Sequence, residues 1–143
     1  MQHNHGTLHT TINNWKVRTA LLALNLFVGL TAIVGGIAIL LGAFQMPGEW
    51  LQNTPFSSYQ IPGMILAVFV GGSALVAAVA VMVRSEWDAL ASLVAGVILA
   101  GWIVSEVVMI GLQSGLQPFY FAIGLLIIGL ATLLLMTEWR RAS

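Results

Sequence analysis

Four long runs of apolar residues, separated by short polar segments, dominate this chain of 143 residues. Each run is long enough for an α-helix to cross the hydrocarbon core of a bilayer, which takes about 20 residues. The pattern therefore predicts an all-α membrane protein with four transmembrane helices in an antiparallel up-down bundle. The predicted spans cover about residues 19–42, 62–83, 89–112 and 118–137.

The segment ahead of the first run has a different character. Residues 1–14 are polar and without periodicity, so we expect a disordered tail before a single transmembrane domain over residues 15–141. The tail contains three histidines, a residue type that can bind metal ions when it is clustered. No second group of ligands accompanies them, so we expect no metal site. These histidines are His3, His5 and His9.

The connection 43–61 is the longest between two runs, and it interleaves acidic and aromatic residues with turn formers such as Pro47 and Gly48. A fully solvated loop would not need such bulky groups, so we expect a structured loop that folds back over the bundle. The loop residues predicted to make contacts are Glu49, Trp50 and Phe56.

The basic residues are distributed unevenly among the ends of the runs. Lys16 and Arg18 precede the first run, Arg84 lies between the second and third, and Arg140 and Arg141 follow the fourth. The two other connections contain no Lys or Arg. Because cytoplasmic loops of membrane proteins are enriched in these residues, the pattern predicts that both termini lie in the cytoplasm.

Composition excludes several classes of function. Apolar residues make up 59% of the chain and charged residues only 7%, whereas a soluble domain carries about 25% charged residues. Five scattered basic residues cannot form the positive stripe that binds nucleic acid. The chain has no Cys, which excludes disulfides and zinc–thiolate sites. No nucleophile–base pair or phosphate-binding glycine loop is present, so we expect neither enzyme activity nor a cofactor.

Small residues at helical spacing predict how the spans pack, because close backbone approach replaces the hydrophobic effect between helices in lipid. The first three spans carry such series, and the fourth carries a poorer one. We therefore expect spans one to three to form the tight core and span four to pack at the periphery. The series are Ala32 and Gly36, then Gly63, Ala67 and Gly71, then Ser92, Gly96 and Ala100.

Two polar residues lie inside the spans and need partners. Asn25, in the first span, is expected to donate a hydrogen bond to another helix. Glu106, in the third, lies about 9 Å along the helix axis from the outer end of its span. Intramembrane acids usually face a bundle interior or a wet cavity, which makes Glu106 the leading candidate for a functional residue.

No Lys or Arg is predicted on the same side of the membrane as Glu106. The carboxyl group must therefore be protonated, hydrogen-bonded to neutral groups, or matched by an external cation. It is predicted to act either as a structural hydrogen-bond hub or as a ligand- or ion-binding group. The candidate neighbours at its level are Tyr59, Gln60, Trp102, Gln113, Gln117 and Tyr120.

Residues 55–63 read Pro-Phe-Ser-Ser-Tyr-Gln-Ile-Pro-Gly. This segment resembles a Pro-Phe-x-x-Tyr-x-aliphatic-Pro-Gly element of small, uncharacterised four-helix membrane proteins of bacteria. The resemblance covers most of residues 20–130 and implies a multi-pass protein of the bacterial cell membrane, without implying an activity. Further positions that resemble the same group are Gly35-Gly36, Trp102 with Glu106, and Leu116-Gln117-Pro118.

Two functions are compatible with these residues. The first is a non-catalytic integral membrane protein, either an accessory subunit of a membrane complex or a binder of an apolar or lipid-like partner at its outer face. Besides the lipid bilayer, its expected partners are further copies of the chain or other subunits of such a complex. The second is a small transporter or cation-binding permease that uses Glu106. A transporter would open Glu106 to each side of the membrane, whereas a structural role would bury it against Tyr or Gln.

Overall fold

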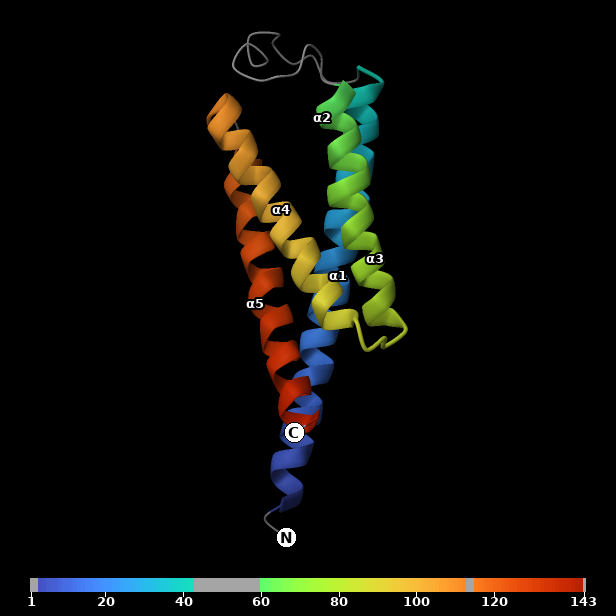
Figure 1. Cartoon of the computed structure of the whole chain (residues 1–143), viewed down its shortest axis with the longest axis vertical. Helices are drawn as coiled ribbons and strands as arrows, with labels where there is room; N and C mark the ends of the chain where they lie inside the picture. Colours follow the sequence, from blue (N-terminus) through green and yellow to red (C-terminus); the bar gives the residue numbers. More distant parts are fainter. Residues whose placement is uncertain (1–2, 43–59, 113–114, 143) are drawn as a thin grey trace.

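The computed structural model of the chain describes residues 3–42, 60–112 and 115–142. Within these residues the protein is built of helices and contains no strand, as the hydrophobic pattern predicts (Figure 1). Four helical stretches are long and apolar enough to cross a membrane. They cover Trp15–Leu40, Gln60–Met82, Asp88–Met109 and Leu116–Glu138, close to the predicted spans.

Glycines end two of the helices. Gly42 and Gly111 follow α1 and α4 with φ of 70° and 77°, a left-handed conformation that glycine adopts without strain. Pro118 lies in the first turn of α5, where its missing N–H leaves no hydrogen bond unmade. The elements are α1 (His3–Leu40), α2 (Gln60–Ile65), the π-helix η2 (Leu66–Gly71), α3 (Gly72–Met82), α4 (Asp88–Ile110) and α5 (Leu116–Ala142).

Helix α1 extends further toward the N-terminus than the sequence pattern predicts. It begins at His3, so the backbone of residues 3–14 continues the helix of the first span. The segment contains no proline and a single glycine, Gly6. Adding residues to an existing helix avoids the cost of nucleating a new one.

The second span changes its helical geometry at η2, where the backbone bonds reach five residues back. In an α-helix, residues four apart are offset by about 40° around the axis, so Gly63, Ala67 and Gly71 would drift away from one face. The wider turn of η2 reduces this drift. A Cβ added to Gly63 would lie 3.2 Å from the Gly36 carbonyl oxygen, and one on Gly71 would lie 3.3 Å from that of Gly29. Both glycines therefore face α1.

The helices form two pairs, because α1 packs along α2, η2 and α3 while α4 packs along α5. In the second pair, a Cβ added to Gly96 would lie 3.1 Å from the Gly124 carbonyl oxygen. Within the described residues the fourth span nonetheless has less contact in total with the other helices than any other span, which agrees with the expected peripheral position. The most extensive contact between two spans joins the first to the second, and the fourth span packs closely on the third. Gly124, although isolated in the sequence, permits this close approach.

The pairs meet closely at one end only. Figure 1 shows both chain termini at this end, and shows the α4–α5 pair diverging from the other helices toward the opposite end. We call the end that contains Arg18, Asp88 and Glu138 the basal end. The end that contains Leu40, Gln60 and Leu116 is the distal end.

Candidate functional site

One arginine joins the two helix pairs at the basal end. Nη2 of Arg18 donates a hydrogen bond to Oε1 of Glu138 at 2.7 Å, and its Nη1 lies 3.3 Å from Oδ2 of Asp88. The Asp88 side chain is fully buried, while those of Arg18 and Glu138 are 24% and 27% exposed. The guanidinium therefore ties α1 to both α4 and α5.

Asp88 is the first residue of α4, and this position helps to hold its charge. Its Oδ1 accepts a hydrogen bond from the backbone N–H of Ala89 at 2.7 Å. The N-terminus of a helix carries a partial positive charge that favours a carboxylate there. Oδ2 has no hydrogen-bond partner among the described residues, so its contact with Arg18 is an ion pair. The carboxylates of Asp88 and Glu138 thus share one guanidinium, and the carboxylate of Asp88 also lies at the positive end of a helix dipole.

A second polar link joins the pairs deeper in the bundle. Nδ2 of Asn25 donates a hydrogen bond to Oγ of Ser92 at 3.2 Å, and both side chains are fully buried. The interhelical hydrogen bond predicted for Asn25 is therefore confirmed. Oδ1 of Asn25 has no hydrogen-bond partner among the described residues. The link connects α1 to α4, like the ion pair below it.

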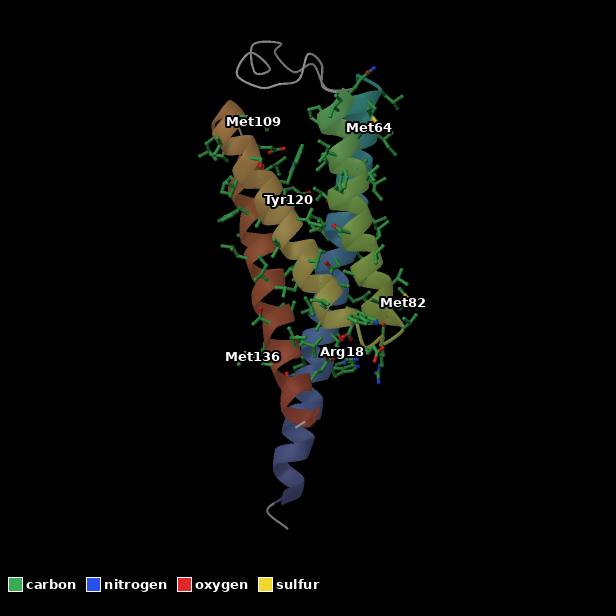
Figure 2. All side chains as sticks on the ribbon, viewed as in Figure 1. Arg18, Met64, Met82, Met109, Tyr120 and Met136 are labelled. Carbon is green, nitrogen blue, oxygen red and sulfur yellow. The ribbon has the colours of Figure 1, made fainter. Side chains whose placement is uncertain are left out.

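Aromatic rings provide a third link between the pairs. The ring of Phe27 on α1 stacks on that of Tyr120 on α5, with centroids 6.1 Å apart and planes 14° apart. Phe119 meets both rings edge-on, at 6.3 Å and 5.5 Å. Figure 2 shows Tyr120 on the side of the α4–α5 pair that faces the other helices. Tyr120, predicted near Glu106, therefore contributes to the junction with α1.

Glu106 lies on α4 in the distal half of the bundle and is half-buried. Its carboxylate accepts hydrogen bonds from the side chains of Trp102, one helical turn away, and Gln117 of α5. Gln117 is buried, and its Nε2 also donates to the carbonyl oxygen of Gly111 at 3.3 Å. Three of the predicted site residues are thus brought together from two helices.

The other predicted site residues are Gln60 and a group that lies outside the described part of the chain. Gln60 is exposed at the start of α2, at the distal end. The remaining predictions fall on positions outside the described residues, so they stay predictions. These are Glu49, Trp50, Phe56, Tyr59 and Gln113.

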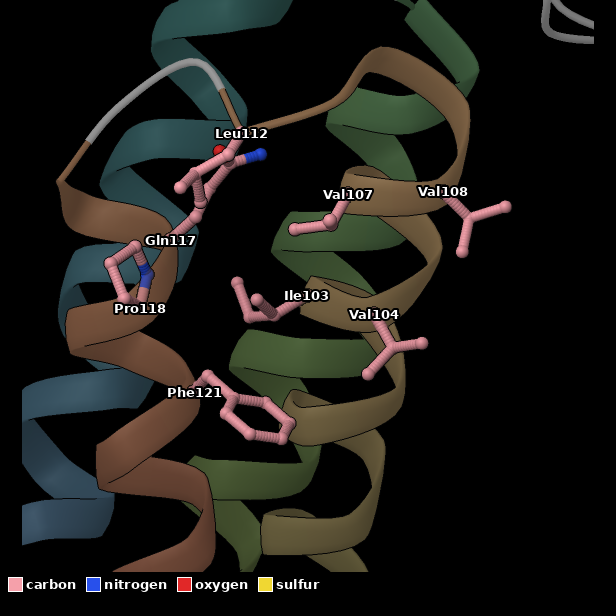
Figure 3. Close-up of a pocket in the computed structure, with 8 residues that line it drawn as sticks. All are labelled: Ile103, Val104, Val107, Val108, Leu112, Gln117, Pro118 and Phe121. Carbon is pink, nitrogen blue, oxygen red and sulfur yellow. The ribbon is translucent and has the colours of Figure 1, made fainter.

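A groove of about 290 Å³ runs between α4 and α5 beside Gln117. Figure 3 shows Gln117 and Leu112 at one end of it and Phe121 at the other, with Ile103 and Val107 pointing toward α5. Gln117 is its one polar residue. Sequence reasoning did not find the groove, because apolar residues are unremarkable in a membrane span. Its lining consists of Ile103, Val104, Val107, Val108, Leu112, Gln117, Pro118 and Phe121.

Within the described part of the chain, no three His, Asp or Glu residues gather as ligands of a metal ion. Comparisons with protein-family models, curated proteins and solved structures find no match to this chain. The candidate site is thus defined by geometry alone, as the Glu106 carboxylate with its two neutral donors and the apolar groove that shares Gln117 with it.

Proposed function

We propose that this chain is a non-catalytic integral membrane protein of the bacterial cell membrane, with antiparallel spans and both termini in the cytoplasm. Four helices of sufficient length and apolarity support the membrane assignment. The positions of Lys16, Arg18, Arg84, Arg140 and Arg141 support the orientation, because positively charged residues concentrate on the cytoplasmic side. In this orientation the basal end faces the cytoplasm and the distal end faces outward.

We propose further that the distal half binds an apolar or lipid-like partner. The observation that carries this proposal is the position of the groove. The groove lies near the distal ends of α4 and α5, and its residues Pro118 and Phe121 flank the α5 rings that Phe27 contacts. Sites for small ligands commonly form between the helices of a bundle, with apolar walls and a few polar groups. A groove of this kind in a bilayer is directly accessible to alkyl chains.

Transport through Glu106 has less support. Its hydrogen bond to Gln117 agrees with the non-transporting alternative, in which the acid is held by neutral side chains. Toward the basal end, the interior contains fully buried apolar residues such as Val28, Leu99 and Ile127. The polar groups that follow are tied to one another between α1 and α4. A proton or ion relay would need a continuous series of polar groups.

Filling the groove tests the proposed function. Val107→Trp places a large side chain in the groove, while Val97→Trp adds the same group to an exposed position of α4 outside the groove. The probe is radiolabelled dodecanol, measured by equilibrium dialysis against protein in phosphatidylcholine nanodiscs, with empty discs subtracted. We expect saturable binding by the wild type and by Val97→Trp, and at least a tenfold weaker affinity in Val107→Trp.

The proposal fails if the wild type shows no saturable binding, or if both variants bind alike. Circular dichroism and thermal unfolding establish that Val107→Trp retains its fold. If dodecanol does not bind and a second polypeptide co-purifies in fixed proportion, the accessory-subunit alternative replaces the binding proposal.

A further inference from the structure

We propose that Asp88 and Glu138 share one proton, which makes the basal contact between the two helix pairs sensitive to pH. In this arrangement the hydroxyl group of Glu138 donates a hydrogen bond to Oδ2 of Asp88, while Oε1 of Glu138 accepts one from Arg18. The proton lies at the basal end, away from the distal groove, so the proposal goes beyond ligand binding there. It is supported by the balance of charge, by one unpaired oxygen and by the positions of the two acids on their helices.

The charges at the basal contact do not balance when both acids are ionised. Nη1 of Arg18 lies 3.3 Å from Oδ2 of Asp88, and its Nη2 lies 2.7 Å from Oε1 of Glu138. One positive charge therefore meets two negative charges, and the Asp88 side chain is fully buried. Unbalanced charge is costly to bury, and two carboxyl groups that share one site tend to retain a proton between them. A single proton makes the sum of the three charges zero.

No other described charged group makes up the difference. Among the described side chains, only Arg18 forms an ion pair with either acid. His9, the nearest histidine of α1, is nine positions before Arg18, about 14 Å along the helix axis. The side chains of Arg140 and Arg141, which follow Glu138 on α5, are outside the described ones. The remaining charged residues near the basal end are exposed, and they are Lys16, Arg84 and Glu86.

An unpaired oxygen indicates where the proton belongs. Oδ1 of Asp88 accepts a hydrogen bond from the backbone N–H of Ala89, but the buried Oδ2 has no hydrogen-bond partner among the described residues. The Glu138 side chain lies within hydrogen-bonding reach of the Asp88 side chain. Two ionised carboxyl groups have only acceptors, so this contact becomes a hydrogen bond only when one of them is protonated. A hydroxyl group on Glu138 supplies the donor that Oδ2 lacks.

The helix ends determine which acid holds the proton. Asp88 is the first residue of α4, where the positive end of the helix dipole stabilises a carboxylate. Glu138 lies four residues before Ala142, the last residue of α5, so it is close to the negative end, which disfavours a further negative charge. Asp88 therefore remains ionised and Glu138 carries the proton. The resulting bond joins a hydroxyl group to a carboxylate, a type about twice as strong as a bond between neutral groups.

The strength of the basal contact then depends on pH. The helix pairs meet closely at this end only (Figure 1), and Arg18 links α1 to both α4 and α5 through the two acids. Raising the pH removes the proton, which breaks the hydrogen bond between the acids and leaves one negative charge unbalanced. Because the folded protein binds a proton that the unfolded chain releases, stability falls as the pH rises through this titration. Glu in an unfolded chain titrates at about pH 4.3, so the fall lies above that value.

Infrared pH-difference spectroscopy tests for the proton directly, because the C=O stretch of a protonated carboxyl group is distinct from the stretches of a carboxylate. The protein is measured in maltoside micelles, since this detergent has no carbonyl group. The band of Glu138 is the one that Glu138→Gln removes. We expect it in the wild type and in Glu86→Gln at neutral pH, and we expect its loss at alkaline pH. Glu86 is an exposed acid near the basal end and serves as the matched control.

Asp88→Asn distinguishes a shared proton from simple burial of Glu138. In this variant Arg18 alone balances Glu138, so Glu138 should ionise and its band should be absent at neutral pH. Thermal unfolding provides a second readout, because the amide of Glu138→Gln donates and accepts hydrogen bonds as the protonated acid does. The wild type and Glu86→Gln should unfold several degrees lower at alkaline than at neutral pH, and Glu138→Gln should lose most of this difference.

The absence of a protonated-carboxyl band of Glu138 at neutral pH would overturn this inference, as would a band that persists in Asp88→Asn. An equal dependence of unfolding on pH in the wild type and in Glu138→Gln would also overturn it. If Glu138→Gln does not fold, ¹³C-labelled glutamate identifies the glutamate bands in the wild type and in Asp88→Asn. One such band should then be lost between these two proteins, and an unchanged set of bands would contradict the proposal.

Discussion

Arg18 and Asp88 form an ion pair between the two helix pairs, with Nη1 of the arginine 3.3 Å from Oδ2 of a fully buried carboxylate. The same guanidinium hydrogen-bonds to Glu138 at 2.7 Å. The contact connects α1 to α4 and α5 at the basal end, while the pairs separate toward the distal end (Figure 1). We call Arg18, Asp88 and Glu138 the basal cluster. It holds the two helix pairs together with one cation between two carboxylates, and the first prediction concerns this balance of charge.

Replacing Arg18 should lower the free energy of unfolding far more than replacing Asp88 or Glu138. Arg18→Met leaves two carboxylates together, one of them buried, and should lower the free energy of unfolding by about 3 kcal/mol or more. Asp88→Asn or Glu138→Gln leaves Arg18 with its other partner, so each should cost only about 1 kcal/mol. The measurement is denaturant unfolding in mixed micelles. Lys16→Met, at an exposed position of the same helix, is the control.

The double variant Arg18→Met/Asp88→Asn provides a further test of the charge balance in the basal cluster. Because it removes the buried acid together with the cation, it should recover part of the stability lost in Arg18→Met. Equal losses in all three single variants would show that charge balance does not determine the stability of the basal end.

Replacing Ser92 should lower the stability of the protein more than replacing Asn25. Ser92→Ala removes the one partner that the Asn25 amide group has among the described residues and should cost about 1 to 2 kcal/mol, because a buried donor is left unpaired. Asn25→Leu removes that donor and also Oδ1, which already has no partner among the described residues. Its stability should therefore stay close to that of the wild type. Thermal unfolding of both variants checks this, and a greater loss in Asn25→Leu would contradict it.

Alanine at Gly36 should disturb the first helix pair. A Cβ there would lie 2.6 Å from the Gly63 carbonyl oxygen and 2.7 Å from the Ala67 Cβ, so the helices must move apart. Overpacking of this kind costs about 1 to 3 kcal/mol. Gly101→Ala is the matched control, because nothing lies within 4 Å of a Cβ at that position. It should stabilise the protein by up to about 1 kcal/mol through helix propensity.

The proposed orientation can be tested with single cysteines, because the chain has no Cys of its own. Ser85→Cys lies in the basal connection between α3 and α4, and Gly115→Cys lies just before α5 at the distal end. In intact cells, a membrane-impermeant maleimide should label Gly115→Cys and should label Ser85→Cys only after permeabilisation. The reverse pattern would overturn the assignment of the termini to the cytoplasm.

Much of the fold was predictable because a bilayer constrains a chain strongly. With no water to satisfy backbone groups, each long apolar run has to form a helix, and the described part of the chain bears this out. Small residues also identified contact faces, as at Gly36 with Gly63 and at Gly96 with Gly124. What spacing did not predict was which spans pair most closely. A single glycine of the fourth span, Gly124, permits its close approach to Gly96 of the third, while the longer series of small residues occur in other spans.

The candidate site was predictable only in its chemistry. Glu106 was identified because a carboxylate inside a membrane span is rare and costly, and Gln117 because it is polar at the same expected level. The groove and the basal cluster were not identified. Groove residues such as Ile103 and Phe121 are ordinary apolar residues, and Arg18 is 120 positions from Glu138 in the sequence.

The sequence by itself determined four membrane-length helices, the asymmetric distribution of positive charge and the presence of one acid within a span, because each depends on local composition alone. The tertiary structure decided that α1 packs with α2 to α3 and α4 with α5, that Arg18 holds the pairs together, and that Gln117 links Glu106 to an apolar groove. These relationships depend on how distant helix faces meet in space. That meeting is governed by backbone approach at a few glycines and by pairing of a few buried polar groups, which no local pattern specifies.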